Sequence, residues 1–369
     1  MSFATDPIGT LRRLAQEQGE VARFDWNGQR CYLLSSPRLI QRALTHQDLH
    51  KRRGQAPAHC LLGRGLMTSE GDLNRDQRKL LRPLFAAGQR PRWQQIVREQ
   101  VEELAAGWSD GQCIISLKEF GQLSMAVACR VLFDQRLPEE RIIHEMLEAV
   151  LKNPLTEVRQ ALDEVADRLL RRGQGPLVEL LLSVPIDDAL RRDEIITMLL
   201  GAHETTATTL AFCMRMLALY QSKADAHQVV GETLRLYPPG WLVARMADQE
   251  LDLEGVRLQA PCAVLISAMV THYRQDLWED PHQFRPERFP THPASGTFFP
   301  FGGGRRICIG ESLAWVEAEE TVDFLRNRWT LEPLERGPVK LLPLASLRPA
   351  CGLPARLRLH SGSAEAGGR

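Results

Sequence analysis

The sequence predicts a mainly helical protein with a minor β-sheet region. Apolar residues recur at helical spacing through much of the first 250 residues, most clearly over residues 193–220. Runs rich in β-branched and aromatic residues are short, and the first two flank Asn27-Gly28, a dipeptide typical of tight hairpin turns. Because the helical patterns are longer and more numerous, the strands are expected to form a small part of the fold.

The other elements are expected in the following places. Helices are predicted over 76–104 with breaks at Pro83 and Pro91, over 138–170 with a break near Pro154, up to Tyr237, and over 310–327. Strands are predicted over 19–34, 252–258 and 262–270 and beyond residue 327, with a turn from Gly173 to Gly175 and no periodicity over 276–306. No repeat or linker divides the chain, so residues 1–359 are predicted to form one domain, followed by a disordered tail over 360–369.

Charge and composition exclude several classes of protein. Lys and Arg number 46, as do Asp and Glu, so no global basic field favours nucleic acid. The first residues carry Asp6, Arg12 and Arg13 without an apolar stretch, which argues against a secretory signal. No run of eighteen apolar residues occurs, so we expect a cytoplasmic protein without a membrane span. The eight cysteines form no C-x-x-C pair and are expected to be reduced thiols, most of them in the core.

Cys308 differs from the other cysteines in its surroundings, FPFGGGRRICIGESLAW. A thiolate ligand must be deprotonated in apolar surroundings, and a helix N-terminus stabilises the charged sulfur. The helix predicted to begin near Gly310 supplies such an end. Ile307 and Ile309 are expected to keep water from the sulfur. The alternative is a buried structural cysteine beside a glycine turn.

The neighbouring residues suit a flat ligand. Gly302, Gly303 and Gly304 lack a Cβ and so permit a tight turn close to such a ligand, and Gly310 would let the helix approach it. Arg306 could pair with an anionic group at the edge of the ligand.

The pattern Phe301-x-x-Gly304-x-Arg306-x-Cys308-x-Gly310 resembles the haem-ligand signature of the cytochrome P450 family, whose compact soluble bacterial members the chain resembles over roughly residues 6–359. The resemblance implies the cytochrome P450 fold, a triangular prism-like single domain. It also implies that Cys308 is the metal ligand of haem b, iron protoporphyrin IX.

A polar turn in the predicted helix 193–220 agrees with this resemblance. Four threonines close to Glu204 can compete for backbone carbonyls, which favours a local distortion of the helix. The adjacent Glu204 and Thr205 resemble the acid–threonine pair of the family. The resemblance implies that Thr205 hydrogen-bonds dioxygen and that Glu204 relays protons. Ala202 stands where the family usually has glycine, and its methyl group is expected to narrow the oxygen groove.

A second motif also matches the family. Glu232 and Arg235 lie three residues apart on one helix face, a spacing that by itself usually means a surface ion pair. The run ETLRLYPP that contains them, together with Pro286-Glu287-Arg288-Phe289, resembles the structural triad of the family. Glu232, Arg235 and Arg288 are therefore expected to retain the fold and the haem without taking part in the chemistry.

The resemblance also implies contacts to the haem and its propionates. The expected cofactor-binding residues, besides Cys308, are Arg306, Arg245, Arg78, Asn74, His272, Phe301, Gly302 and Gly310. Asn74 stands where the family usually has Trp or His, so it can donate a hydrogen bond but brings no ring. Arg78 has an alternative reading as part of a solvated helix face with Arg75, Lys79 and Arg82.

The implied function is a haem-thiolate monooxygenase that inserts one oxygen atom into a lipophilic small molecule such as a terpenoid, fatty acid or carotenoid. Electrons would come from a separate ferredoxin or flavodoxin with its reductase, and the basic helix Arg75–Arg82 is a candidate docking surface. The alternatives are a peroxide-dependent peroxygenase and a non-catalytic haem-thiolate sensor or carrier. Apolar residues expected to face the haem cavity are Ala202, Trp241, Leu242, Val243 and Leu347. The stretch from Asp134 to Gly201 is short for the family, which predicts an open pocket or else a degenerate member.

Overall fold

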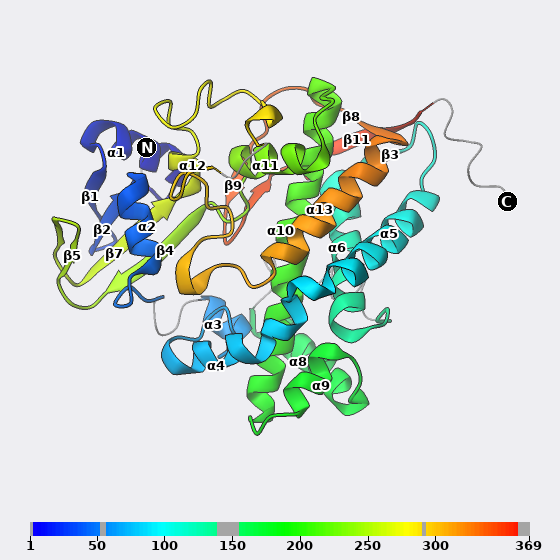
Figure 1. Cartoon of the computed structure of the whole chain (residues 1–369), viewed down its shortest axis with the longest axis horizontal. Helices are drawn as coiled ribbons and strands as arrows, with labels where there is room; N and C mark the ends of the chain where they lie inside the picture. The colour runs from blue at the N-terminus through cyan, green and yellow to red at the C-terminus, as the bar shows by residue number, and fades with distance from the viewer. Residues whose placement is uncertain (1–2, 52–56, 139–154, 290–292, 361–369) are drawn as a thin grey trace. The chain divides into compact units, whose positions relative to one another are not determined.

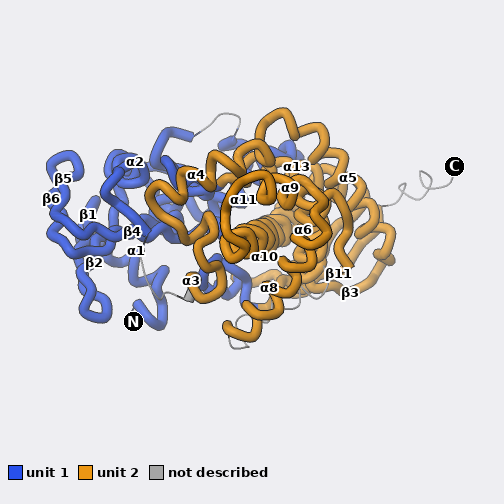
Figure 2. Tube along the Cα trace, turned by 90° about the horizontal axis from the view of Figure 1, so that it is seen from below, with its two compact units in different colours: residues 1–52, 222–308, 339–350 blue, residues 53–221, 309–338, 351–369 orange. Residues whose placement is uncertain are grey.

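The computed structural model describes residues 3–51, 57–138, 155–289 and 293–360. Its internal contacts divide the chain into two compact units, shown in different colours in Figure 2. Unit 1 comprises residues 1–52, 222–308 and 339–350, and unit 2 comprises residues 53–221, 309–338 and 351–369. Each unit is built from separate stretches of chain. The single domain expected over residues 1–359 stays a prediction.

Unit 1 is organised around a four-stranded sheet with the order β1-β2-β7-β4. Its strands are β1 (Val21–Trp26), β2 (Gln29–Leu34), β7 (Cys262–Ser267) and β4 (Leu242–Ala247). β1 and β2 form the predicted hairpin, and Asn27 and Gly28 have φ of 49° and 75°, as a type I′ turn requires. β2 and β7 pair in parallel, while β7 and β4 are antiparallel. The strand expected over residues 262–270 is therefore an inner strand of this sheet up to Ser267, and its last three residues begin a short helix instead.

The helices of unit 1 have clear start signals in the sequence. They are α1 (Pro7–Gln18), α2 (Pro37–Thr45), α11 (Ala226–Leu236) and the short α12 (Ala268–Thr271). Asp6 caps α1 by accepting the N–H of Gly9 at 2.9 Å. Asp225 and Gln228 form a capping box on α11, which ends before Tyr237 as predicted. Two small strand pairs complete the unit: β5 (Leu251–Leu253) with β6 (Val256–Leu258), and β9 (Leu341–Pro343) with β10 (Leu347–Pro349).

Unit 2 is helical, and its longest helix is α10 (Asp188–Tyr220). α10 packs against α6 (Ser116–Phe133) and α13 (Glu311–Arg326), as Figure 1 shows. The other helices are α3 (Pro57–Leu62), α4 (Gly71–Leu81), α5 (Arg90–Ala106), α8 (Leu155–Arg172) and α9 (Pro176–Leu182). A small antiparallel sheet with the order β3-β11-β8 contains β3 (Cys113–Ile115), β11 (Pro354–Leu359) and β8 (Trp329–Pro333). α10 thus carries the expected helix 193–220 through the core of the unit.

Two predicted boundaries are corrected. α10 begins at Asp188 because the side chain of Asp187 accepts the N–H of Leu190 at 2.8 Å and caps the helix earlier than periodicity suggested. Pro91 lies in the first turn of α5, where a missing N–H costs nothing, so it begins a helix rather than breaking one. The first part of the helix pair expected over 138–170 and most of the predicted tail lie outside the described residues.

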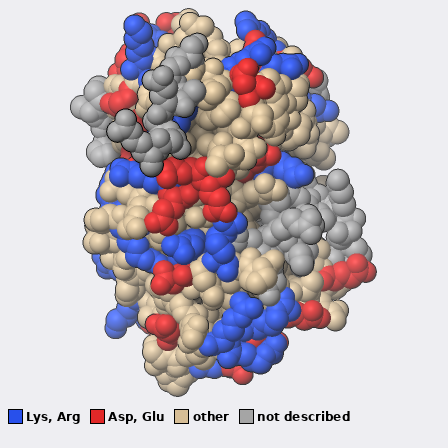
Figure 3. Space-filling view, turned by 90° about the vertical axis from the view of Figure 1, so that its right-hand side faces the viewer, with Lys and Arg blue, Asp and Glu red and all other residues tan. Residues whose placement is uncertain are grey.

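Opposite charges are mixed on the surface, as the balanced composition implies. Figure 3 shows basic and acidic side chains interspersed on one face. In unit 2, Arg90 pairs with Glu319 at 3.0 Å and Arg98 with Glu320 at 2.7 Å, which joins α5 to α13. Within the described ranges, none of the helices is long and apolar enough to cross a membrane.

The core of unit 2 contains a buried carboxyl group, Glu317 of α13. Its side chain is 3% exposed, and among the described residues its Oε1 atom has no hydrogen-bond partner. Burial raises the pKa of Glu317 to about 8, mainly through desolvation of the charged form. Glu317 therefore stays protonated in the folded state over a pH range in which the unfolded chain releases the proton.

The protonated Glu317 predicts how stability depends on pH. The folded pKa of about 8 exceeds the ordinary 4.5, so the folded state holds more protons than the unfolded state between these values. We expect this group to lower the free energy of unfolding as pH rises through that window, by up to about 1.4 kcal/mol per pH unit. Glu317→Gln should flatten this slope in urea titrations from pH 5 to 8. An equally steep slope in Glu317→Gln would contradict the assignment.

Candidate functional site

The segment around Cys308 folds into a loop closed by its own backbone. The N–H of Cys308 donates to the carbonyl oxygen of Phe301 at 3.0 Å, and the N–H of Ile307 donates to Gly304 at 3.1 Å. Cys308 is exposed, and the Ile307 beside it is 38% exposed. α13 begins three residues later at Glu311, with Gly310 as its N-cap residue. The loop therefore presents a thiol and an apolar side chain three residues before the first residue of α13.

The three glycines of this loop have different roles. A Cβ on Gly304 would lie 2.3 Å from the carbonyl oxygen of Leu44, and its φ is +61°. A Cβ on Gly303 would lie 3.0 Å from the side chain of the same Leu44. These two glycines seat the loop against α2, which corrects the expectation that all three serve a flat ligand. Gly302, with φ of +74°, has no described atom within 4 Å of its Cβ position.

These features test whether the residues fit a haem group. A macrocycle bound through sulfur needs an accessible thiolate, apolar surface beside it and backbone that does not obstruct its plane. Cys308 offers the thiol, Ile307 the apolar surface and Gly302 the open backbone, all on one loop. The donor set is a single thiolate, which is the set that a haem-thiolate protein uses.

The predicted triad Glu232, Arg235 and Arg288 is assembled in unit 1. Arg235 donates from Nε and a terminal nitrogen to both carboxylate oxygens of Glu232, each at 2.7 Å. Arg288 donates to Glu232 at 3.3 Å, and the backbone N–H of Arg285 donates to it at 2.9 Å. Glu232 and Arg235 have no exposed side-chain surface. The motif is thus a buried ion network and not the surface pair that its spacing alone would suggest.

Arg235 also satisfies backbone groups of the loop after α12. It donates to the carbonyl oxygens of His272 at 2.7 Å, Pro281 at 2.8 Å and Gln283 at 3.2 Å. A Cβ on Gly231 would lie 2.8 Å from the ring of Phe289, so the helix that carries the triad packs closely against the segment that carries Arg288. Desolvation lowers the pKa of Arg288. The network ties residues 272–289 to α11.

His272 does not fit the expected role at a haem propionate. Its ring is fully buried, and its Nε2 accepts the N–H of Phe299 at 3.2 Å. The proton therefore resides on Nδ1, which donates to the carbonyl oxygen of Arg235 at 3.2 Å. Desolvation lowers the pKa of His272 to about 3, so the ring is neutral. Both nitrogens are used within unit 1, and no charge remains to attract a carboxylate.

Asn74 is likewise used inside its own unit. Its amide nitrogen donates to the carbonyl oxygen of Leu66 at 3.0 Å and to the hydroxyl of Ser69 at 3.1 Å. The residue is 5% exposed. Because an amide has two donor hydrogens and both are engaged, the expected haem contact through Asn74 is corrected to a structural role.

The other cations expected to bind the haem propionates remain predictions. Arg245 is a buried residue on β4 and donates to the carbonyl oxygen of Ala244 at 2.9 Å. Arg306 is half-buried and ends a short 3₁₀ turn that begins at Gly304, and Arg78 is half-buried on α4. Each of these side chains is long enough to pair with a carboxylate, and a guanidinium can do so with two parallel hydrogen bonds.

The polar turn of α10 is helical throughout. Thr205 donates its hydroxyl to the carbonyl oxygen of Gly201 at 3.1 Å, and Thr209 donates to Thr205 at 3.0 Å. Both hydroxyls are therefore bonded to carbonyl oxygens one turn earlier in the helix, and α10 is helical without a break from Asp188 to Tyr220. Gly201, Ala202, Glu204 and Thr205 are half-buried, whereas the rest of this central part of α10 is largely buried.

The expected pocket residues divide into two groups. Trp241 is 5% exposed and donates its ring N–H to Leu344 at 2.9 Å, and Leu347 is fully buried. Both belong to the hydrophobic core of unit 1, and their expected place at a ligand remains a prediction. Ala202, Leu242 and Val243 are half-buried, so each has exposed surface that a ligand could contact.

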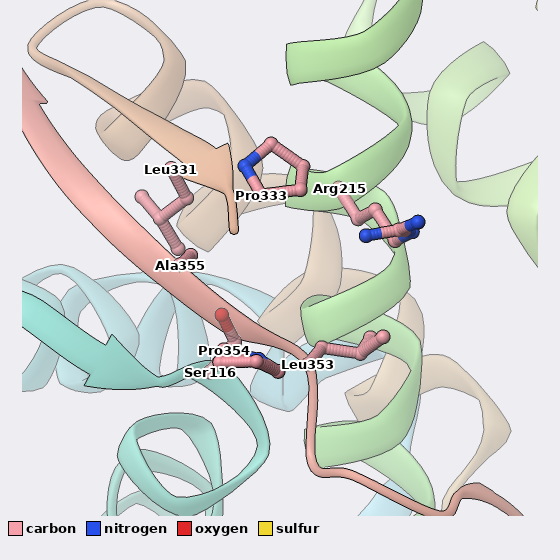
Figure 4. Close-up of a pocket in the computed structure, with 7 residues that line it drawn as sticks. All are labelled: Ser116, Arg215, Leu331, Pro333, Leu353, Pro354 and Ala355. Atoms are coloured by element: carbon pink, nitrogen blue, oxygen red, sulfur yellow. The ribbon is translucent and has the colours of Figure 1, made fainter. Parts of the chain in front are cut away.

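A separate shallow pocket in unit 2 lies between α10 and the small sheet. Its lining residues are Ser116, Arg215, Leu331, Pro333, Leu353, Pro354 and Ala355 (Figure 4). Arg215 donates to the carbonyl oxygens of Glu335 at 2.7 Å and Gly337 at 2.9 Å. Arg215 thereby holds the chain that follows β8, and the lining of this pocket contains none of the predicted site residues.

Comparisons with known proteins agree with the fold. The sequence model described as Cytochrome P450 matches residues 3–176 and 225–343. Cyclooctat-9-en-7-ol 5-monooxygenase of Streptomyces melanosporofaciens is 27% identical over 86% of this chain and 83% of its own length. Pentalenene oxygenase of Streptomyces avermitilis is 23% identical over 93% of this chain and 90% of its own length.

The solved structures with a similar fold are also cytochrome P450 proteins. CYP175A1 from Thermus thermophilus superposes with a TM-score of 0.84 at 26% identity, covering 97% of this chain and 96% of its own. A six-coordinated cytochrome P450 from another strain of Thermus thermophilus has a TM-score of 0.83 at 26% identity, covering 96% and 99%. The chain belongs to the cytochrome P450 family. It is accordingly an oxidoreductase of the monooxygenase class with protoporphyrin IX haem as its cofactor.

The family match has a gap over residues 177–224, between its two matched ranges. The matched ranges include Cys308 and the triad Glu232, Arg235 and Arg288, but not the acid–threonine pair on α10. The assignment of Glu204 and Thr205 therefore depends on their own motif and on the half-buried turn that carries them.

Proposed function

We propose that this protein inserts one oxygen atom from dioxygen into a terpenoid-like, apolar small molecule, with Cys308 as the proximal ligand of the haem iron. The observation that carries the proposal is the exposed thiol of Cys308 on a backbone-closed loop just ahead of α13. When bound, the haem supplies oxygen activation, which a thiolate ligand favours by donating electron density. The protein contributes binding, orientation and proton delivery.

The proton-handling residues in this proposal are Glu204 and Thr205. The Thr205 hydroxyl donates to the carbonyl oxygen of Gly201 at 3.1 Å, which leaves its oxygen lone pairs able to accept a hydrogen bond. Glu204 precedes it on α10, and since adjacent helical side chains do not face each other, Glu204 would pass a proton to that hydroxyl through water. Arg306, Arg245 and Arg78 are proposed to pair with the haem propionates, and Phe301, Gly302 and Gly310 to lie against the macrocycle.

The substrate class is supported by two kinds of observation. The names of the Streptomyces relatives refer to cyclooctat-9-en-7-ol, cyclooctatin and pentalenene as compounds on which those proteins act or which they make. Ala202, Leu242 and Val243 are apolar and half-buried in this chain, which suits a hydrocarbon skeleton. Fatty acids and carotenoids are the competing substrate classes.

Turnover of the haem-loaded enzyme tests this proposal. The enzyme is supplied with NADPH, a surrogate ferredoxin and its reductase, and is offered a cyclic diterpene alcohol, a sesquiterpene hydrocarbon, a fatty acid or β-carotene. We expect a terpenoid product that carries one labelled oxygen atom from labelled dioxygen. Product formed with hydrogen peroxide alone would favour a peroxygenase. No product from any compound, despite a normal thiolate spectrum, would favour a sensor or carrier.

The natural electron donor is proposed to be a ferredoxin or flavodoxin that docks on the basic face of α4. Arg75 is 72% exposed and pairs with Asp72 at 2.9 Å. Lys79 is exposed on the same helix, and the exposed Arg82 comes directly after its last residue. An acidic docking surface on the donor would be steered towards these cations by the opposite charge.

Charge reversal tests this docking surface. In Arg75→Glu/Arg82→Glu, we expect the first-electron transfer from ferredoxin to slow by roughly ten-fold at low salt, because steering is lost. The difference should shrink as added salt screens the charges. The matched control is Lys118→Glu/Arg171→Glu, which reverses two exposed cations on α6 and α8. Stopped-flow reduction rates that fall equally in both double variants, or in neither, would refute the assignment.

A further inference from the structure

Segment 63–69, which links α3 to α4, is held by two adjacent carboxylates near the start of α10. Asp193 accepts the backbone N–H of Arg64 at 2.7 Å, and Glu194 accepts the backbone N–H of Leu66 at 3.1 Å. All of these residues belong to unit 2. The segment forms neither a helix nor a strand, so these side chains supply hydrogen bonds that such an element would otherwise provide.

Close packing leaves the segment little freedom on this side. A Cβ on Gly63 would lie 2.2 Å from a carboxylate oxygen of Asp193, and one on Gly65 would lie 2.0 Å from the hydroxyl of Thr197. From α4, Gln77 donates to the carbonyl oxygen of Arg64 at 2.8 Å. Segment 63–69 is therefore clamped by α10 and α4 through polar groups at specific backbone positions.

The two carboxylates differ in how their charge is compensated. Arg159 of α8 donates to Asp193 at 2.6 Å and to Asp163 at 2.8 Å. Glu194 is 1% exposed, and within the part of the chain that the structure describes its Oε1 has no hydrogen-bond partner. Desolvation raises the pKa of Glu194 to about 7, with Asp193 adding to the effect. Glu194 is thus a costly buried group, and its Oε2 is committed to the backbone of Leu66.

The residue after Leu66 reaches the polar turn of α10. The terminal methyl of Met67 lies 3.8 Å from the Cβ position of Gly201, and Met67 is 41% exposed. Gly201 also accepts the hydroxyl of Thr205. Glu194 precedes Gly201 by two turns of the same helix, about 10 Å along its axis. One rigid helix therefore fixes both the anchor of the segment and the surface against which Met67 lies.

We propose that Glu194 is a positioning residue for substrate: by holding the N–H of Leu66, it fixes Met67 against Gly201. Met67 then limits the space available to a bulky apolar molecule beside the acid–threonine turn. This inference rests on the proposed function of that turn. The affinity for small ligands should not depend on Glu194, whereas the affinity for large ligands should. Only a large ligand would contact the Met67 side chain.

Four haem-loaded variants test the role of Glu194. Glu194→Ala removes the acceptor, and Glu194→Gln keeps an acceptor oxygen at the same place. Met67→Ala removes the proposed steric element, and Asp188→Asn is the matched control at an exposed position of α10. Hydrogen exchange of segment 63–69 reports the clamp. Spectroscopic titration with imidazole and with the larger 1-phenylimidazole at one pH reports the space above the iron.

We expect Glu194→Ala to speed exchange of the Leu66 amide roughly ten-fold, the effect of losing one buried hydrogen bond. The ratio of the 1-phenylimidazole and imidazole dissociation constants should change several-fold in Glu194→Ala and in Met67→Ala, whereas Glu194→Gln and Asp188→Asn should match the wild type. Unchanged exchange in Glu194→Ala, or an unchanged ratio in Met67→Ala, would overturn the inference. If Glu194→Ala does not fold, the ratio of the two dissociation constants in Met67→Ala still tests whether Met67 limits the space for a ligand. Normal exchange behaviour in a protein that lacks the thiolate spectrum would count against the proposed function instead.

Discussion

Cys308→Ala is expected to abolish the strongly red-shifted Soret band of the reduced carbon monoxide complex, and monooxygenase turnover with it. The band would require a thiolate bound to the haem iron, and an alanine methyl group cannot bind iron. Turnover should fall by on the order of 10³-fold or more, the scale of losing one member of a catalytic assembly. The measurement is the dithionite-reduced difference spectrum, recorded beside wild type at equal haem content.

The structure explains why this substitution should be selective. The loop is closed by the backbone N–H of residue 308, which donates to Phe301, and by the contact of Gly304 with α2, and alanine preserves both. Cys351→Ala is the matched control, because Cys351 is another exposed cysteine but follows β10. A red-shifted band that survives in Cys308→Ala, or disappears in Cys351→Ala, would show that the ligand is another residue.

Local patterns allowed much of this fold to be predicted. The Asn27-Gly28 hairpin, the end of α11 before Tyr237 and the helix after Cys308 each depend on residues within a few positions of one another. The Glu232 and Arg235 pair could be recognised because both partners lie on one helical turn, although their burial could not be read from the spacing. Rules that use neighbouring residues therefore predicted helices, strands and motifs better than they predicted the burial and distant contacts of side chains.

The failed predictions concern side chains whose partners are distant in sequence. His272 is neutral because its ring is enclosed by groups from Arg235 and Phe299, which no local pattern connects to it. Asn74 was assigned to the haem by resemblance to the family, yet its amide donates within its own unit to groups that no local pattern connects to it. Glu194 gave no signal at all, because an acidic residue early in a helix usually indicates only a solvated first turn.

The second large effect is expected at Glu232. Glu232→Gln removes the negative charge that compensates Arg235 and Arg288, in a place where Arg235 has no exposed surface. We expect the free energy of unfolding to fall by about 3–5 kcal/mol, the usual cost of leaving a buried charge unpaired. Urea unfolding of the haem-loaded protein measures it, and loss of haem on dilution should accompany it. Glu287→Gln is the control, since Glu287 lies in the same segment as Arg288 but pairs with Arg285 near the surface.

The expected result for Glu287→Gln is a change within about 0.5 kcal/mol, as for most exposed ion pairs. Equal losses in the two variants would show that the Glu232 network is no stronger than a surface pair.

Replacing both Glu232 and Arg235 by leucine distinguishes two contributions of Arg235: its ion pair with Glu232 and its hydrogen bonds to the loop after α12. Buried pairs can often be exchanged for apolar residues at little cost. Here Arg235 also donates to the carbonyl oxygens of His272, Pro281 and Gln283, and leucine would leave these three without that donor. The double variant should therefore remain destabilised, because Arg235 organises the loop after α12 as well as neutralising Glu232.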